Sequence, residues 1–411
     1  MRLSSTNWKS NMGRFLIKHR RKDSVFVVIT VLLSFVVSLV LCEATLRVFA
    51  PAWLQYRMAV LNPEGTVEGF GSDAAWPVER RNGSFYSWIP LSSFSVSHLE
   101  YETIAHIDEL GGRMVSASSA SKSNLLLPLL GDSFTFGIGV NDDETFVSKI
   151  ADKIQHFRVL NLGVPETALT QQIELIERRH HDLGNPQRYF FFFSLGNDFD
   201  DMILAEQATG HAKKAANVDL ETPYPILIAL NNLATNTPIL RQSYLLQLAR
   251  QFGIDILNRM RQRDGALPVW NASFYIMDKS MDAYRSDAQS AVKKQLDKLL
   301  SLQETMNFKS MIVAIPDVHQ VDASRRKLFA DRFGISTDQL DPRLPNQLLA
   351  DALRTVDIPL FDATECIANG RNADSYYYQR DTHFRPAGHE ALARCVINDN
   401  EVRRFLDIPE D

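Results

Sequence analysis

An uninterrupted apolar run near the N-terminus is the first feature of the hydrophobic pattern. The stretch from Val25 to Leu41 carries no charged residue. At about 1.5 Å per residue, a helix of this length approaches the roughly 30 Å hydrocarbon core of a bilayer. A helix inside a soluble protein keeps a polar stripe, which this run lacks. Residues 24–44 are therefore predicted to form a transmembrane helix. A cleaved signal peptide is the main alternative, but the segment ahead of the run is long for one and Cys42-Glu43-Ala44 is a weak cleavage motif.

The charges that flank this run predict its orientation. Six Lys and Arg residues between Lys9 and Lys22, in the basic tail 1–23, precede it, whereas only Arg47 and Arg57 follow it closely. The positive-inside rule then places the tail in the cytoplasm. The chain is accordingly expected to be a single-pass protein of the cell inner membrane, with everything after residue 44 periplasmic or otherwise extracytoplasmic. Glu43 and Arg47 are one helical turn apart, which predicts that the helix continues beyond the membrane.

From residue 125 onward, short apolar runs alternate with segments of helical periodicity. Each run ends at a turn, and the run from Tyr189 to Leu195 is apolar enough for a strand buried on both faces. Strand, turn and helix in repeating order predict an α/β domain with a parallel sheet. The runs are Leu125–Leu130, Phe157–Gly163, Tyr189–Leu195, Lys309–Ile315 and Ile358–Asp362.

Two stretches do not follow this alternation. Residues 45–124 form an N-terminal extracytoplasmic segment of mixed pattern, with a strand-like patch at Ser93–Ser97. Residues 203–307 are mostly helical by period and too long for one crossover, so we interpret them as a helical insertion that shapes a substrate cleft. The α/β domain is then expected in two parts, 125–202 and 308–411.

Composition and charge exclude several functions. The chain has 411 residues, of which 45% are hydrophobic and 23% charged, which suits a large globular core. The net charge of -5 provides no basic excess for a phosphate backbone, so nucleic acid is not expected as a partner. The three cysteines show no metal-ligand spacing, and no metal site is expected. In an oxidising compartment Cys366 and Cys395 either form a disulfide or remain two separate thiols, and the sequence leaves both open.

Polar residues that suit ester chemistry follow the predicted strands. Ser133 ends the first run, Gly163 the second, and Asn197 follows the third; Asp381 and His383 lie in the last loop before a helix. The carboxyl ends of strands in a doubly wound sheet share one edge, so these residues are expected to converge. A serine nucleophile needs a base, a carboxylate that orients the base, and donors for an oxyanion. The set therefore predicts a serine-dependent active site.

These residues resemble the four sequence blocks of the SGNH, or GDSL, hydrolase superfamily. The matching blocks are Gly131-Asp132-Ser133, Asn161-Leu162-Gly163, Gly196-Asn197-Asp198 and Asp381-Thr382-His383, and the resemblance covers about residues 125–202 and 308–398. It implies a three-layer, flavodoxin-like doubly wound fold and an esterase, lipase, carbohydrate acetyl-esterase or acyltransferase activity without a cofactor.

Carried over by position, the resemblance assigns roles to individual residues. Ser133 is the nucleophile, His383 the general base and Asp381 the residue that orients His383. The expected oxyanion-hole donors are the backbone N–H groups of Ser133 and Gly163 and the side chain of Asn197.

Three departures from the family pattern stand out. Glu166 replaces a second glycine, Gly196 directly precedes Asn197, and a single residue separates Asp381 from His383. The last spacing resembles membrane-associated members, including proteins of exopolysaccharide O-acetylation. The side chains of Tyr376, Tyr377 and Tyr378 either stack on sugar rings or pack against the sheet. His389 is interpreted as a helix-start residue rather than a second base.

The expected function is attack by Ser133 on an acylated carbohydrate or lipid outside the cytoplasmic membrane. Water as acceptor gives an esterase, and a sugar hydroxyl gives an O-acetyltransferase, which would need a membrane partner that supplies acyl groups. The alternative is a non-catalytic binding or assembly protein in cell-surface polysaccharide modification that keeps the same fold.

Overall fold

The computed structural model describes residues 7–50, 54, 78–81, 84–98, 100–116, 123, 125–154, 156–209, 242–263, 272–333, 335–370, 375–379 and 381–408. The chain divides into two compact units. One comprises Met1–Asn62 and Ala229–Ile254, and the other comprises Pro63–Ile228 and Asp255–Asp411. Each unit is described by itself.

The first unit contains the long helix α1 (Asn7–Phe49), which includes the predicted span 24–44. Within the described residues, the segment Ile29–Phe49 is long and apolar enough to cross a membrane. The helix continues beyond residue 44 as predicted, and the Arg47 guanidinium pairs with the Glu43 carboxylate at 3.0 Å.

The same end of α1 holds the start of helix α9 (Tyr244–Arg263). The Glu43 carboxylate accepts hydrogen bonds from the Ser243 hydroxyl and from the Tyr244 and Leu245 backbone N–H groups, at 2.9 to 3.1 Å. A helix start leaves its first N–H groups without helical partners, and an anion there is favoured by the helix dipole. Glu43 therefore serves as the N-terminal cap of a helix 200 residues further along the chain.

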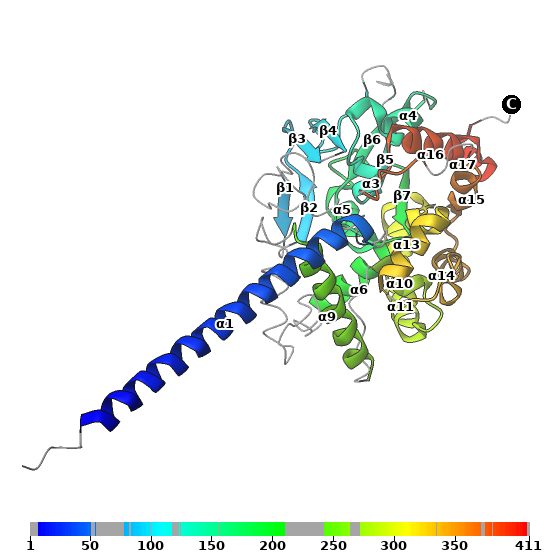
Figure 1. Ribbon diagram of the computed structural model, residues 1–411. Helices are drawn as coiled ribbons and strands as arrows, with labels where there is room; N and C mark the ends of the chain where they lie inside the picture. The colour runs from blue at the N-terminus through cyan, green and yellow to red at the C-terminus, as the bar shows by residue number, and fades with distance from the viewer. Residues whose placement is uncertain are drawn as a thin grey trace, which may run out of the picture. The chain divides into compact units, whose positions relative to one another are not determined.

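A five-stranded parallel sheet forms the centre of the second unit (Figure 1). The order is β6-β5-β7-β8-β9, and all strand pairs are parallel. This is the 2-1-3-4-5 order of the flavodoxin-like doubly wound fold, so the predicted α/β class is confirmed. Each predicted run overlaps a strand: β5 (Leu126–Gly131), β6 (Arg158–Gly163), β7 (Arg188–Ser194), β8 (Lys309–Ile315) and β9 (Leu360–Asp362).

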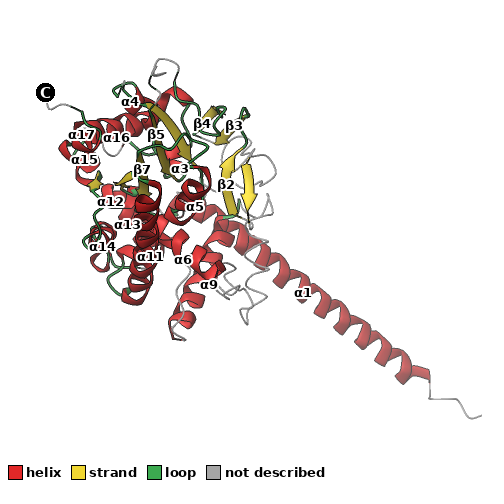
Figure 2. Ribbon diagram, turned by 180° about the vertical axis from the view of Figure 1, so that it is seen from behind, coloured by secondary structure: helices red, strands yellow, loops and turns green. Residues whose placement is uncertain are grey.

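Helices cover both faces of this sheet, which gives three layers (Figure 2). Side chains of β7 alternate between the layers: Phe191 and Phe193 face one helical layer, and Phe190 and Phe192 face the other. All four are at most 2% exposed, which explains why the strand is a continuous apolar run. One layer contains α5 (Leu169–Arg179), α6 (Asp198–Thr209), α11 (Asp282–Met306) and α14 (Leu344–Leu353), and the other contains α4 (Phe146–Ala151), α15 (Thr364–Ala368), α16 (Pro386–Asn398) and α17 (Asn400–Phe405).

Shorter helices complete the second unit. They are α3 (Ser133–Phe136), α10 (Ala272–Met277), α12 (Val318–Val321) and α13 (Ala323–Phe333), with 3-10 turns η2 (Asp142–Glu144) and η3 (Thr337–Gln339). Of the predicted insertion 203–307, the described parts are mainly helical, whereas residues 210–241 and 264–271 lie outside the described residues. The predicted domain boundaries stay a prediction.

Two β-hairpins precede the sheet in the sequence. They are formed by β1 (Val78–Arg81) with β2 (Ser84–Trp88), and by β3 (Ser93–His98) with β4 (Tyr101–His106). The predicted patch Ser93–Ser97 lies in β3. A separate apolar cluster joins the hairpins to the segment after Ser133 and includes Trp88, Tyr101, Phe136, Ile138 and Tyr378.

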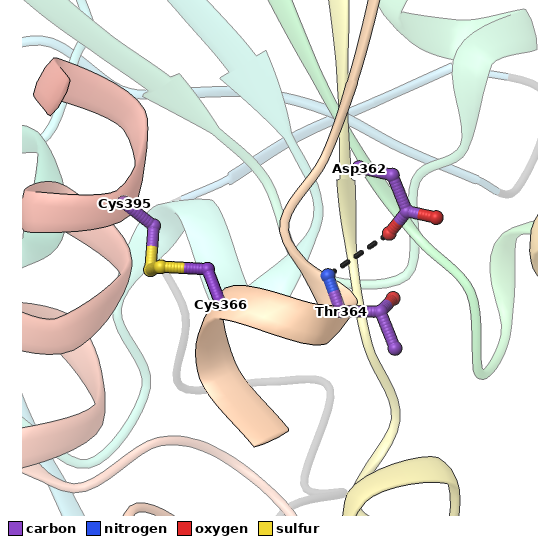
Figure 3. The surroundings of a disulfide bond; sticks show 4 residues. All are labelled: Asp362, Thr364, Cys366 and Cys395. Atoms are coloured by element: carbon purple, nitrogen blue, oxygen red, sulfur yellow. Dashed lines mark hydrogen bonds between the residues drawn. A yellow bond between two sulfur atoms is a disulfide. The ribbon is translucent and has the colours of Figure 1, made fainter. Parts of the chain in front are cut away.

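A disulfide links Cys366 on α15 to Cys395 on α16 (Figure 3). The two Cα atoms are 6.0 Å apart, which resolves the alternative that the sequence left open. The closed loop between them contains both Asp381 and His383. The disulfide therefore fastens together the two helices that flank these residues.

Candidate active site

Ser133 lies at the turn between β5 and the short helix α3. The Asp132 side chain caps this helix by accepting the Phe134 backbone N–H at 2.9 Å. The helix ends after one turn at Gly137, whose φ of 91° is in the left-handed region that favours glycine. This short helix holds the partly exposed Ser133 just past the end of β5, the strand that has β6 on one side and β7 on the other, at the carboxyl edge of the sheet. In a doubly wound sheet this is the switch point at which ligands bind.

Ser133, His383 and Asp381 form a continuous chain of hydrogen bonds. The Ser133 Oγ atom is 2.7 Å from His383 Nε2, and His383 Nδ1 is 2.5 Å from Asp381 Oδ1. The same Asp381 oxygen also accepts the His383 backbone N–H at 3.0 Å. The spacing of one residue between the acid and the histidine thus lets one carboxylate oxygen fix both the main chain and the ring of His383.

The charges of this chain of residues favour an ionised aspartate and a basic histidine. Burial opposes ionisation of Asp381, but the charge and hydrogen bonds of His383 and the Tyr101 hydroxyl outweigh it and hold the pKa of Asp381 well below its usual range. Burial likewise opposes the charged form of His383, but Asp381 and the Asp132 charge outweigh it and raise the pKa of the imidazole. His383 therefore suits the role of a general base.

The predicted oxyanion role of Gly163 stays a prediction, and the structure shows how its backbone is held. Its backbone N–H already donates to Asn161 Oδ1 at 3.0 Å. Asn161 also donates to the Thr135 carbonyl at 2.9 Å, so its side chain ties the end of β6 to the turn that carries Ser133. A Cβ atom on Gly163 would lie 2.2 Å from the Phe136 backbone nitrogen. The glycine is needed because the α3 backbone packs directly against it.

Asn197 lies just before α6, partly exposed. Its Nδ2 atom donates to Asp201 Oδ2 at 2.9 Å, which orients the side chain. Gly196 packs against Asp317, because a Cβ atom there would lie 2.8 Å from Asp317 Oδ2. The Gly-Asn spacing noted in the sequence therefore reflects a close contact with the segment after β8.

Acidic side chains gather behind Asn197. Burial and the neighbouring charges of Asp132 and Asp201 raise the pKa of Asp198 well above its usual range. Burial, followed by the charges of Asp132, Asp200 and Glu166, raises the pKa of Asp201 to about 7, although the Asn197 hydrogen bond opposes this. Sequence reasoning missed Asp201, although its i, i+4 spacing from Asn197 on a helix was a usable signal.

Replacement of Asp201 by asparagine is expected to stabilise the protein at high pH. A raised acid pKa means that the folded protein binds a proton more tightly than the unfolded chain, so the wild type loses stability as the pH rises from about 4 through 7. Asp201→Asn keeps an oxygen for Asn197 and removes this loss, about 2 kcal/mol or more at pH 8. Urea unfolding at pH 8 and pH 4 measures it; the gain should vanish at pH 4. The exposed Asp297→Asn is the control, and an equal gain at both pH values would contradict the assignment.

Arg113 is a second residue that the sequence pattern did not reveal. It is 1% exposed and donates to the carbonyls of Phe136, Gly137 and Val140 at 2.5 to 2.9 Å. Its Nε atom donates to Asp142 at 2.9 Å. A buried guanidinium with four partners fastens the segment after the nucleophile, and burial lowers its pKa despite Asp142.

The other residues singled out in the sequence have structural roles. Tyr376, Tyr377 and Tyr378 are at most 7% exposed, so they pack inside the protein rather than stack on sugars. His389 lies in α16, 1% exposed, and its Nδ1 accepts the Phe146 backbone N–H at 3.1 Å. Glu166 is exposed and has a φ of 61°, a glycine-like conformation at the position where the resembling family carries glycine.

Three residues of the N-terminal hairpins also reach this site. Glu100 and Tyr101 contact the loop of Asp381, although they are about 280 residues away in the sequence. Trp88 on β2 donates its indole N–H to the Gly163 carbonyl at 2.9 Å. The site is therefore built from three separate parts of the chain.

Comparisons with known proteins give a likeness of fold only. No protein-family model matches the chain, and no curated protein matches its sequence. Among solved structures it is similar to the lipase/acylhydrolase from Enterococcus faecalis (12% identity, 69% of this chain and 96% of that one, TM-score 0.34). It is also similar to a lipolytic G-D-S-L family protein from Veillonella parvula DSM 2008 (12%, 67% and 98%, 0.35) and to an acetyl xylan esterase (11%, 66% and 97%, 0.32). With TM-scores this low, the proposals below rest on the geometry of the site.

Proposed function

We propose that this protein is a serine-dependent ester hydrolase or acyltransferase of the SGNH type. The observation that carries the proposal is the hydrogen-bonded chain from Ser133 Oγ through His383 to Asp381. A nucleophile, a base within reach of its proton and a carboxylate that orients the base are the three parts that covalent acyl transfer requires. A non-catalytic binding protein would have no need of this alignment.

In the proposed reaction His383 Nε2 takes the proton of Ser133 Oγ as the oxygen attacks the ester carbonyl. The Asp381 charge stabilises the imidazolium that forms. The tetrahedral oxyanion is held by the Ser133 backbone N–H and by the Asn197 amide. His383 then protonates the departing alcohol, which leaves an acyl group on Ser133. A second hydroxyl, activated by His383, releases the acyl group and restores the serine.

The acceptor determines which of two activities results. Water gives a hydrolase, and a sugar hydroxyl gives a transferase that would need a membrane partner to supply acyl groups. The proposed substrate is an acylated carbohydrate or lipid outside the cytoplasmic membrane. This placement is supported by the candidate span within α1, by the basic residues that precede it, and by the disulfide, which is typical of oxidising compartments. Product analysis with and without an oligosaccharide acceptor separates hydrolysis from transfer.

The first test is labelling of the full-length chain in detergent micelles with a fluorophosphonate probe. Such a probe reacts with activated serines and does not require the natural substrate. We expect labelling at Ser133, located by mass spectrometry, and none in Ser133→Ala. An unlabelled wild-type protein that is folded would overturn the proposal.

The rate of this labelling is expected to rise with pH. Only neutral His383 can accept the serine proton, and the pKa of His383 is raised from its usual value of 6.5. In a plot of labelling rate against pH, the midpoint of the rise should therefore lie above pH 6.5. A midpoint below that value would show that His383 is not the base.

A further inference from the structure

We propose that Tyr101 is a positioning residue of the catalytic triad, which acts on His383 through Asp381 and sets the basicity of the imidazole. The inference rests on the proposed function and extends it to a segment that lies outside the resemblance to known hydrolases. It is carried by a contact between the second hairpin and the catalytic loop.

The two oxygens of Asp381 have different partners. Oδ1 accepts the ring and backbone N–H groups of His383, and Oδ2 accepts the Tyr101 hydroxyl. Tyr101 is the first residue of β4, 280 residues before Asp381. The carboxylate that orients the base is therefore fixed from both sides, by the histidine on one and by the hairpin on the other.

Packing fixes the position of the Tyr101 hydroxyl. The residue is 9% exposed, and its ring lies 4.8 Å from the ring of Tyr378 and 5.1 Å from that of His98. Tyr378 is held in turn because its hydroxyl donates to the Gly139 carbonyl at 2.7 Å. A buried ring between two aromatic neighbours has little freedom to turn its hydroxyl away from Asp381.

Glu100 holds the main chain of the same loop. Its two carboxylate oxygens accept the backbone N–H groups of Gln379 and Asp381, at 2.8 and 2.9 Å. Adjacent residues at the tip of the hairpin thus bind the backbone and the side chain of Asp381. This double contact indicates that the hairpin orients the catalytic loop.

The charged groups around the contact keep the tyrosine a donor. Burial, followed by the charges of Asp381, Tyr378 and Glu100, raises the pKa of Tyr101, so its hydroxyl stays protonated. The groups that face Asp381 and Tyr101 are His383, Glu100, His98 and Tyr378, and the Asp132 charge acts on His383.

Hydrogen-bond donation by Tyr101 withdraws charge from the carboxylate that stabilises the imidazolium. Without the hydroxyl, Asp381 would hold the His383 proton more tightly, and the base would be neutral over a narrower pH range. Hydrogen bonds to charged groups are strong, and the loss of this one is expected to shift the titration midpoint of His383 upward by about 0.5 to 1 pH unit.

The test is a pH titration of His383 in the full-length protein in detergent micelles, with ¹³C-labelled histidine observed by NMR. The His383 resonance is assigned by its absence in His383→Gln. In Tyr101→Phe, which keeps the packed ring, we expect the upward shift given above and labelling of Ser133 at pH 7 slowed about three- to tenfold. The NMR titration does not require Ser133 to react, so it tests the role of Tyr101 independently. A failure of the proposed function would appear separately, as a wild-type protein that the fluorophosphonate probe does not label.

The matched control is Tyr189→Phe. Tyr189 is another buried tyrosine, whose hydroxyl lies 2.9 Å from His180 Nδ1 at the opposite end of β7 from Asn197. Its replacement should leave the His383 midpoint in place. An unchanged midpoint in Tyr101→Phe, or an equal shift in both variants, would overturn the inference.

Discussion

Replacing His383 with alanine is expected to slow labelling of Ser133, and any ester hydrolysis, by on the order of 10⁴-fold or more. His383 Nε2 lies 2.7 Å from Ser133 Oγ and can accept the proton of the hydroxyl. The variant removes this base. Pseudo-first-order labelling rates at pH 8, and the rate with p-nitrophenyl acetate, measure the loss. A residual rate within tenfold of the wild type would show that another group activates the serine.

His389→Ala is the matched control for this prediction. His389 lies six residues after His383, in α16, but it is buried in the core and accepts the Phe146 backbone N–H. Its removal leaves that buried N–H without an acceptor, at about 1–3 kcal/mol of stability. The folded fraction should label at Ser133 at the wild-type rate.

Loss of the Cys366–Cys395 disulfide is expected to lower the free energy of unfolding by about 3.5 kcal/mol. The bond closes a loop across 29 residues, and the chain-entropy relation gives this value for that length. The loop carries Asp381 and His383, so the labelling rate should fall as well, because these residues lose part of their preorganisation. Urea unfolding of Cys366→Ser with Cys395→Ser, and of the wild type with and without reductant, measures the change.

Cys42 provides the control for reductant and for cysteine replacement. It is the free, exposed cysteine of the described residues. Cys42→Ser should unfold as the wild type does and should keep its sensitivity to reductant. If reductant leaves the unfolding curve of the wild type unchanged, the disulfide does not form in the folded protein.

The sheet was predictable because buried parallel strands leave a plain signal. Each strand is covered by helices on both faces, so its residues are apolar without interruption, as in Tyr189 to Phe193. Placement of Ser133 and Asn197 at the carboxyl edge follows from the strand ends alone. The pairing of Cys366 with Cys395 was not predictable, since it depends on how α15 packs against α16.

The support of the site could not be predicted from local pattern. The alternating burial of β4 identifies a strand, but nothing in it indicates that Tyr101 meets a carboxylate 280 residues away. Gly163 was assigned to the oxyanion hole from its position in the family resemblance. The sequence pattern did not reveal the contact with Asn161, whose side chain accepts the N–H two residues ahead, as asparagine commonly does.

The long separation of the proposed catalytic residues along the chain affects when the site can form during synthesis. Ser133 and His383 are 250 residues apart, and synthesis at about 5–20 residues per second separates them by roughly 10 to 50 seconds. Throughout that interval the serine has no base, and Tyr101 has no carboxylate to bind. In the proposed mechanism, the nascent protein therefore carries an inert hydroxyl, and the serine becomes reactive only after residues 381–383 have been made and have folded onto the hairpin.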